Sequence, residues 1–196
     1  MGVALDINKR YSYADYQNWM DGKVYELFDG IVKMMSPAPR ARHQELIYEF
    51  CGEFRRIIKN HKGKCKVYPA PFDVRLPKNG EKEDKDIYTV VQPDLCVVCD
   101  LSKIDERGCL GAPDMIIEVQ SFATAKHDLN EKFRLYECAG VREYWVVFPY
   151  ENAILKFLIG EDGKYGEAER FEFDAEIEIS TFAGEKIKLK DIFDNG

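Results

Sequence analysis

A chain of 196 residues, of which 45% are apolar and 32% charged, is typical of a globular domain that buries its own core. The chain has no run of about 18 apolar residues and no basic segment followed by an apolar one at its start. We therefore predict no membrane span and no secretion signal, and we place the protein in the cytoplasm. The formal net charge of -7 also argues against a protein that holds nucleic acid by overall positive charge.

The first predicted elements are a short helix and a hairpin. Aromatic residues at helical spacing predict a helix from Tyr11 to Met20, which ends at a turn signal. Asp29 and Gly30 lie between two β-prone runs, and this pair favours a two-residue hairpin turn with positive φ at both positions. The following stretch with Pro37 and Pro39 is an extended linker, because proline disfavours helix there and in the residue before it.

A long amphipathic helix is predicted from His43 to Asn60. Its apolar residues recur at helical spacing, and His43 lies near the centre of that apolar stripe in the first turn. A histidine there is more often a hydrogen-bonded core residue than a catalytic one. The helix also begins a stretch of cations without an acid, which is either a solvated face or a phosphate-binding surface. Its members are Arg55, Arg56, Lys59, Lys62, Lys64 and Lys66, with Arg40 and Arg42 upstream.

Two strands follow. Residues 67–76 predict an edge or irregular strand, because the run contains prolines. Residues 90–99 predict a buried strand that carries Pro93-Asp94. The six cysteines lie mostly in apolar runs, and the Cys96-x-x-Cys99 pair lacks a second pair to complete a zinc site. We therefore predict free thiols.

The segment from Pro113 to Pro149 predicts a βαβ unit. Its first strand, 114–119, alternates so that Glu118 and Gln120 share one face with Asp114. In the following helix, Ala125, Leu129, Phe133 and Tyr136 form an apolar stripe, and Gly140 suits the residue after its end. Lys132 lies beside that stripe, so its long side chain can bring the ammonium to the polar face of the strand. Residues 144–148 predict a central strand, and period-two patterns after Pro149 predict β-hairpins.

Two acids on neighbouring strands are the candidate chemical centre. A carboxylate inside an apolar strand costs several kcal/mol unless a partner or a metal compensates for it, so Glu118 calls for a function. Asp94 and Glu118 together can bind a hard cation such as Mg²⁺ through oxygen. A nearby lysine would orient or deprotonate water and neutralise a phosphate.

These residues and several longer stretches resemble a known family. Asp94, then Glu118 with a polar residue two positions on, then a helix bearing lysine, resembles the PD-(D/E)xK nuclease superfamily. More narrowly, the chain resembles the Uma-type restriction endonuclease family. The matching stretches are YELFDGIVKMMSPAPRARHQ (25–44), QPDL (92–95), APDMIIEVQS (112–121), DLNEKFRLYECAGVREYW (128–145) and STFAGEKIKLKDIF (180–193).

The resemblance implies a restriction-endonuclease-like α/β fold, in which a mixed central sheet lies between helices and carries added N-terminal and C-terminal β-hairpins. One domain would span 1–196, with an N-terminal helix and hairpin extension (1–42), a nuclease core (43–149) and a C-terminal hairpin extension (150–196). The resemblance also implies that Asp94 and Glu118 hold Mg²⁺, or Mn²⁺ in its place.

The chain departs from the superfamily pattern at two places. Gln120 stands where a lysine is expected, so the basic role passes to the helix, at Lys132 or at Lys126 on the other edge of the stripe. The first core helix offers His43 where an acid is common, and Glu26 is a candidate for the missing carboxylate, although a structural role is about equally expected. Asp114 is assigned mainly a turn-forming role after Pro113.

Two functions remain open on this evidence. The first is a Mg²⁺-dependent endonuclease that cuts DNA, with Gln120 and Lys132 positioning water and phosphate. The sequence leaves its oligomeric state open, and a homodimer, if formed, would use a twofold symmetric contact. The second is a catalytically degenerate module that binds nucleic acid or protein on the same fold. A small-molecule hydrolase has little support, because neither GxSxG nor HExxH occurs.

Overall fold

Four α-helices and three β-sheets are present in the computed structural model over the residues that it describes, namely 5–6, 8–19, 23–35, 40–61, 63–120 and 127–194. The helices are α1 (Tyr13–Tyr16), α2 (Ala41–Asn60), α3 (His127–Ala139) and α4 (Leu189–Phe193), with short 3-10 helices η1 (Asp84–Asp86) and η2 (Leu101–Lys103). The strands are β1 (Tyr25–Phe28), β2 (Ile31–Met34), β3 (Lys66–Pro69), β4 (Val74–Arg75), β5 (Val90–Val91), β6 (Leu95–Val98), β7 (Ile104–Asp105), β8 (Gly108–Leu110), β9 (Met115–Val119), β10 (Glu143–Phe148), β11 (Ala153–Leu158), β12 (Glu169–Phe171), β13 (Glu176–Glu178) and β14 (Lys186–Lys188).

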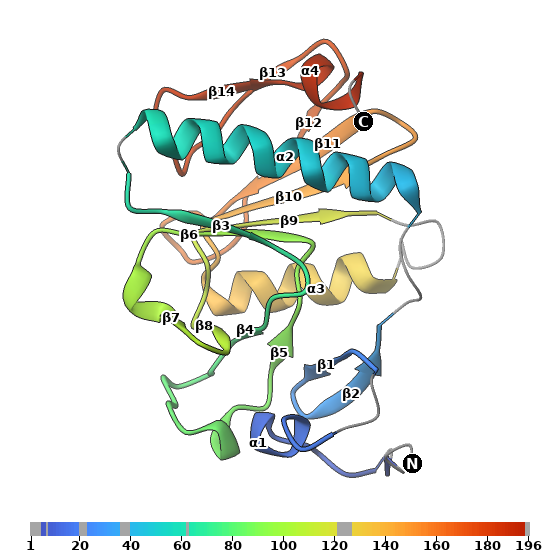
Figure 1. The fold of residues 1–196 in the computed structure, drawn as a ribbon, viewed down its shortest axis with the longest axis vertical. Coiled ribbons are helices and arrows are strands. Elements are labelled where there is room, and N and C mark those ends of the chain that lie inside the picture. Colours follow the sequence, from blue (N-terminus) through green and yellow to red (C-terminus); the bar gives the residue numbers. More distant parts are fainter. Residues whose placement is uncertain are drawn as a thin grey trace.

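The main sheet is mixed and has the strand order β12-β11-β10-β9-β6-β3. Strands β9 and β10 are parallel and are joined through α3, which confirms the predicted βαβ unit. The other neighbours in this sheet are antiparallel. Figure 1 shows α2 on one side of the sheet and α3 on the other, so both faces of the central strands are covered.

Two apolar cores fill the space between the main sheet and these helices. Met115, Ile117 and Trp145 pack with the buried side chains of α2. Ile116 and Tyr144 pack on the opposite face with Tyr136 of α3 and with the second sheet. This alternation follows from the period of two along a strand. Because both faces are buried, the central strands read as continuous apolar runs, in which a carboxylate such as Glu118 is exceptional.

A second sheet has the order β2-β1-β5-β4-β8-β7. The predicted hairpin is present: Phe28 pairs with Ile31, and Asp29 and Gly30 have φ values of 52° and 81°. The hairpin is not an appended unit, however, because Leu27 pairs with Val90 and so joins it to a larger sheet. The expectation of one central sheet was therefore incomplete. The predicted N-terminal helix is also shorter than expected, because α1 covers only Tyr13–Tyr16.

The stretch 90–99, predicted as one strand, divides between the two sheets. Strand β5 pairs with β1 and β4, whereas β6 pairs with β9 and β3. Proline cannot donate to a strand ladder, and Pro93 lies at the break between the two strands. Residues 67–76 divide in the same way, into β3 and β4. The break places Asp94 directly before β6, at the end of the main sheet.

The C-terminal part both extends and covers the main sheet. Strands β11 and β12 add to its edge, and β13 and β14 form a separate hairpin, as the period-two pattern predicted. Ile177, Leu189 and Ile192 of the hairpin and α4 share the core on the α2 side, where Figure 1 shows these elements beyond α2. No helix within the described residues combines the length and the apolar content that crossing a bilayer requires.

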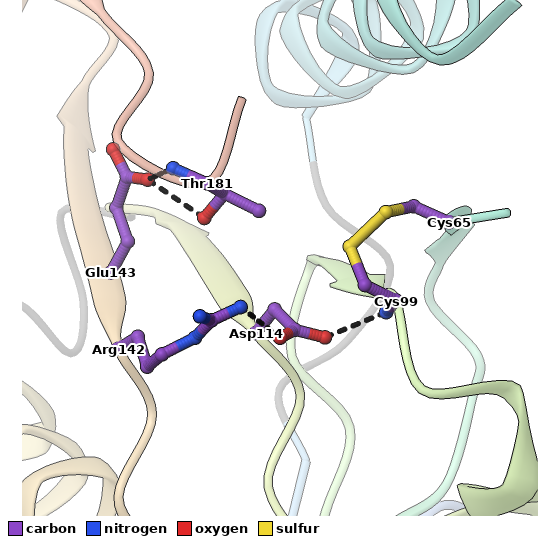
Figure 2. Close-up of a disulfide and its surroundings, with 6 residues drawn as sticks. All are labelled: Cys65, Cys99, Asp114, Arg142, Glu143 and Thr181. Atoms are coloured by element: carbon purple, nitrogen blue, oxygen red, sulfur yellow. Dashed lines mark hydrogen bonds and ion pairs between the residues drawn. A yellow bond between two sulfur atoms is a disulfide. The ribbon is translucent and has the colours of Figure 1, made fainter. Parts of the chain in front are cut away.

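A disulfide joins Cys65 and Cys99, which contradicts the prediction that all six cysteines are free (Figure 2). The antiparallel register of β3 and β6 pairs Lys66 with Val98, so the residues just outside this pair face each other. The pairing of two strands that are distant in sequence decides this contact, and the cysteine spacing does not reveal it. Cys51, Cys96, Cys109 and Cys138 are free.

Removing this crosslink is expected to lower stability. A Cys65→Ser/Cys99→Ser variant should lose about 2 to 4 kcal/mol in the free energy of unfolding, because the bridge closes a 34-residue loop in the unfolded chain. Urea titration of the oxidised wild type, the reduced wild type and the variant measures the effect. Equal stability of all three samples would contradict the crosslink.

Candidate active site

Five elements meet at the end of the main sheet where β9 ends, namely β1, β6, β9, α2 and α3. The antiparallel register pairs Leu95 of β6 with Ile117 of β9. Extended by one residue, this register places Asp94 opposite Glu118, and directly opposite residues of an antiparallel pair have Cα atoms about 4.5 to 5.5 Å apart. The two acids named from the sequence are therefore neighbours. The first turn of α2 adds His43 to the same end.

Asp94 is held by two donors through one of its oxygens. Its Oδ2 lies 3.1 Å from His43 Nε2 and accepts a hydrogen bond of 2.8 Å from the backbone N–H of Val119. Burial lowers the pKa of the His43 imidazole, but the hydrogen bond and the charge of Asp94 outweigh burial and raise the pKa above its ordinary value. His43 therefore orients the Asp94 carboxylate and partly balances its charge.

The Lys132 ammonium of α3 lies between two buried carboxylates. Its Nζ is 2.9 Å from Glu118 Oε1 and 3.2 Å from Glu26 Oε1 of β1. Glu118 Oε1 also accepts a hydrogen bond of 2.6 Å from the Tyr136 hydroxyl, and Glu26 Oε1 accepts one of 3.0 Å from the backbone N–H of Gln92. The helix lysine thus reaches the strand acid, as its place beside the apolar stripe predicted.

Burial and mutual charge determine the protonation of this group. Burial raises the pKa of Glu118 to about 7, although the Lys132 charge acts in the opposite direction, and the nearby charges of Asp94 and Glu26 add to the rise. Burial would lower the pKa of Lys132, but the two glutamates outweigh it and hold that pKa well above its ordinary value. Lys132 therefore remains an ammonium ion, which suits charge stabilisation better than proton removal from water.

The remaining predicted residues occupy different positions. Gln120 follows β9 directly, and its buried Oε1 has no hydrogen-bond partner among the described residues. Asp114 lies just before β9, about 13 Å from Glu118 at the usual rise per residue, so these two cannot share one ion. Lys126, the alternative helix lysine, lies outside the described residues.

Two other acids, the half-buried Asp114 and the buried Glu143, have hydrogen bonds typical of structural carboxylates (Figure 2). Asp114 uses both oxygens, because Oδ2 accepts from the Cys99 N–H and Oδ1 from Arg142. Glu143 also uses both: Oε1 accepts from Trp145 Nε1, and Oε2 accepts from the N–H and hydroxyl of Thr181. These bonds attach neighbouring segments, and Glu143 in particular anchors the C-terminal segment to β10.

The carboxylates at the end of the sheet differ, because their described hydrogen bonds reach only one oxygen each. These bonds use Oδ2 of Asp94, Oε1 of Glu118 and Oε1 of Glu26. No group of three or more histidine, cysteine or acidic side chains in the described ranges is arranged to hold a metal. Mg²⁺, however, is commonly bound by one or two carboxylates with water as the other ligands. The second oxygens of Asp94 and Glu118 therefore fit such an ion.

Sequence reasoning missed one contributor to this group. Tyr136 was assigned to the apolar stripe of α3, and its ring is indeed buried, but its hydroxyl donates to Glu118. Tyr136 lies four residues after Lys132, a spacing that places both side chains on one face of a helix. That spacing is the signal that could have identified it.

Comparison with known proteins agrees with this fold. No curated protein shows significant sequence similarity to the chain. The crystal structure of a "putative nuclease belonging to DUF820" from Anabaena variabilis ATCC 29413 is similar, with a TM-score of 0.73 and 18% sequence identity over 94% of this chain and 98% of that one. The model of the Uma2 family, described as "Putative restriction endonuclease", matches residues 13–189. Because that match spans most of the sequence, the chain belongs to the Uma2 family.

Proposed function

We propose that this protein is an endonuclease that hydrolyses phosphodiester bonds in DNA with Mg²⁺, or Mn²⁺, held by Asp94 and Glu118. The observation that carries the proposal is the pair of opposed carboxylates at the end of the sheet, each with one oxygen outside the described hydrogen bonds, beside a buried lysine ammonium. Family membership adds support, because the Uma2 model carries the description "Putative restriction endonuclease".

The side chains have different proposed roles, which follow from their charge and protonation. Asp94 and Glu118 would hold a divalent cation, which would supply charge neutralisation for the phosphate when bound. The Lys132 ammonium stabilises negative charge that builds up on phosphate oxygens, and Glu26 holds it in place. Gln120 Oε1, for which the described part of the chain offers no hydrogen-bond partner, can accept a hydrogen bond from the attacking water. His43 is a positioning residue, because it acts on Asp94.

One observation favours a second candidate, a nucleic-acid-binding module without catalysis. Lys132 already neutralises Glu118 and Glu26 from within the protein, so these acids are satisfied in part without any metal. In that case the site is a structural ion-pair network. The two functions differ in whether a divalent cation binds.

Thermal unfolding in the presence of metal tests the proposal. Millimolar Mg²⁺ or Mn²⁺ should raise the midpoint of the wild type relative to EDTA, because a ligand that binds only the folded state stabilises it by about 2.7 kcal/mol at a hundred times its Kd. For a chain of this size that energy corresponds to roughly 5 to 10 °C.

The matched variants separate a specific site from a general salt effect. Asp94→Asn and Glu118→Gln should each remove the metal-dependent rise. Asp114→Asn, which changes a carboxylate at the other end of the same strand, should keep it. A wild-type midpoint that is the same in EDTA and in either metal would overturn the endonuclease proposal in favour of the binding module.

A further inference from the structure

A continuous groove between α2 and β3 leads away from Asp94. Its first part is a cavity of about 550 Å³, whose lining includes His43 and Asp94 at one end and Arg55 and Val67 at the other. A second cavity of about 980 Å³ also includes Arg55 and Val67 in its lining, so the two are contiguous. Figure 1 shows β3 beneath the C-terminal half of α2.

The far part of the groove is strongly basic. Five cations line the second cavity, and no acidic residue does: they are Arg55, Arg56, Lys59, Lys64 and Lys66. Arg56 is paired with Glu53, whereas the other four form no ion pair within the part of the chain that the structure describes. All five are exposed. In a protein of net charge -7, this surface is a local concentration of positive charge, which can attract a polyanion.

The near part of the groove has a different character. Tyr48 lines the cavity next to Asp94 and is 77% exposed. Ile47 and Val67 add apolar surface beside it. An exposed tyrosine over an apolar floor offers a flat face on which a nucleobase can stack.

We propose that this groove, Tyr48 with Arg55, Lys59, Lys64 and Lys66, binds a single-stranded segment of nucleic acid and leads it to the Asp94–Glu118 centre. The basic end holds the phosphates and Tyr48 stacks a base. A positive groove combined with an aromatic platform is how proteins bind single strands irrespective of sequence. The inference rests on the proposed function only for the statement that the nucleic acid leads to the Asp94–Glu118 centre. Binding itself does not require catalysis, so the two can fail separately.

Fluorescence anisotropy in EDTA tests the groove without cleavage. A fluorescein-labelled oligothymidine should bind the wild type more tightly than a duplex of equal length. Lys59→Ser/Lys64→Ser should reduce the slope of log K against log salt by about 1.4, because each phosphate contact to a single strand contributes about 0.7. Tyr48→Ala should weaken binding about fivefold or more. Lys82→Ser/Lys190→Ser makes the same charge change elsewhere on the exposed surface and should change the slope little.

Several outcomes would overturn this inference. One is equal loss in the groove and control double variants, which would indicate general electrostatics. Another is binding of duplex at least as tight as single strand with no effect of Tyr48→Ala. An oligouridine arm distinguishes RNA from DNA, and tight binding of either polymer supports the groove.

The test also separates this inference from the proposed catalysis. The groove variants should keep the metal-dependent rise in unfolding midpoint. Glu118→Gln should keep oligothymidine binding. Binding that persists in a wild type without any metal response would support the groove and overturn the endonuclease.

Discussion

Replacing Lys132 with methionine is expected to lower the free energy of unfolding by about 3 to 5 kcal/mol, because the change leaves buried carboxylates without their cation. Lys132 is 15% exposed in its side chain, and Glu26 and Glu118 are 9% exposed. Methionine keeps most of the side-chain volume, so the loss reflects charge rather than a cavity. Urea titration at several pH values measures it.

The pH dependence of this loss has a definite sign. The pKa of Glu118 is already raised to about 7, and removing the Lys132 charge raises it further. A carboxyl group with a raised folded-state pKa holds a proton that the unfolded chain releases, so stability falls as pH rises between the two pKa values. The deficit of Lys132→Met should therefore be small near about pH 5 and largest above about pH 8.

Lys164→Met is the matched control for this variant. Lys164 pairs with Glu137, but its side chain is 63% exposed, so its loss should cost less than about 1 kcal/mol. Two outcomes would contradict this prediction: an equal loss in the free energy of unfolding for the two lysine variants, or a Lys132→Met loss that does not change with pH. Either would show that the buried ion pair contributes no more to stability than the exposed one.

Cleavage of DNA should fall by at least about a hundredfold in Asp94→Asn and in Glu118→Gln, the scale set by loss of one electrostatic catalytic group. Each amide keeps the size of the acid but removes the negative charge that a cation requires. Nicking of supercoiled plasmid and degradation of circular single-stranded DNA, with Mg²⁺ or Mn²⁺, measure the effect.

Asp114→Asn is the control for cleavage, because both oxygens of Asp114 are engaged with Cys99 and Arg142 away from the site. It should keep activity and lose stability. Cleavage that persists in both site variants would point to another site or to contamination. Full activity of Lys132→Ala with loss in Lys126→Ala would assign the basic role to the other lysine.

Local sequence patterns predicted the local elements well. The apolar stripe of α2 and the Asp29-Gly30 turn depend on side-chain spacing and on backbone dihedrals within a few residues. The βαβ order around α3 is likewise visible in the chain. The candidate acids Asp94 and Glu118 were named from their strands and from family resemblance, and Lys132 from its place on its helix.

Local sequence patterns did not predict the contacts between distant segments. The division of residues 90–99 between two sheets, the Cys65–Cys99 bridge and the use of Glu143 to anchor Thr181 all depend on which strands pair and in what register. In a single sequence, apolar periodicity shows which face of a strand is buried. It does not identify the neighbouring strand, because many strands have the same periodicity.

Local patterns in the chain therefore specify which elements carry the candidate side chains, namely two strand acids and a helix lysine. The packing of distant elements brings Asp94 opposite Glu118 and places Lys132 between Glu118 and Glu26. The physical reason is that local periodicity sets the face of each side chain, whereas the β6–β9 register and the docking of α3 set the distances across which charges act.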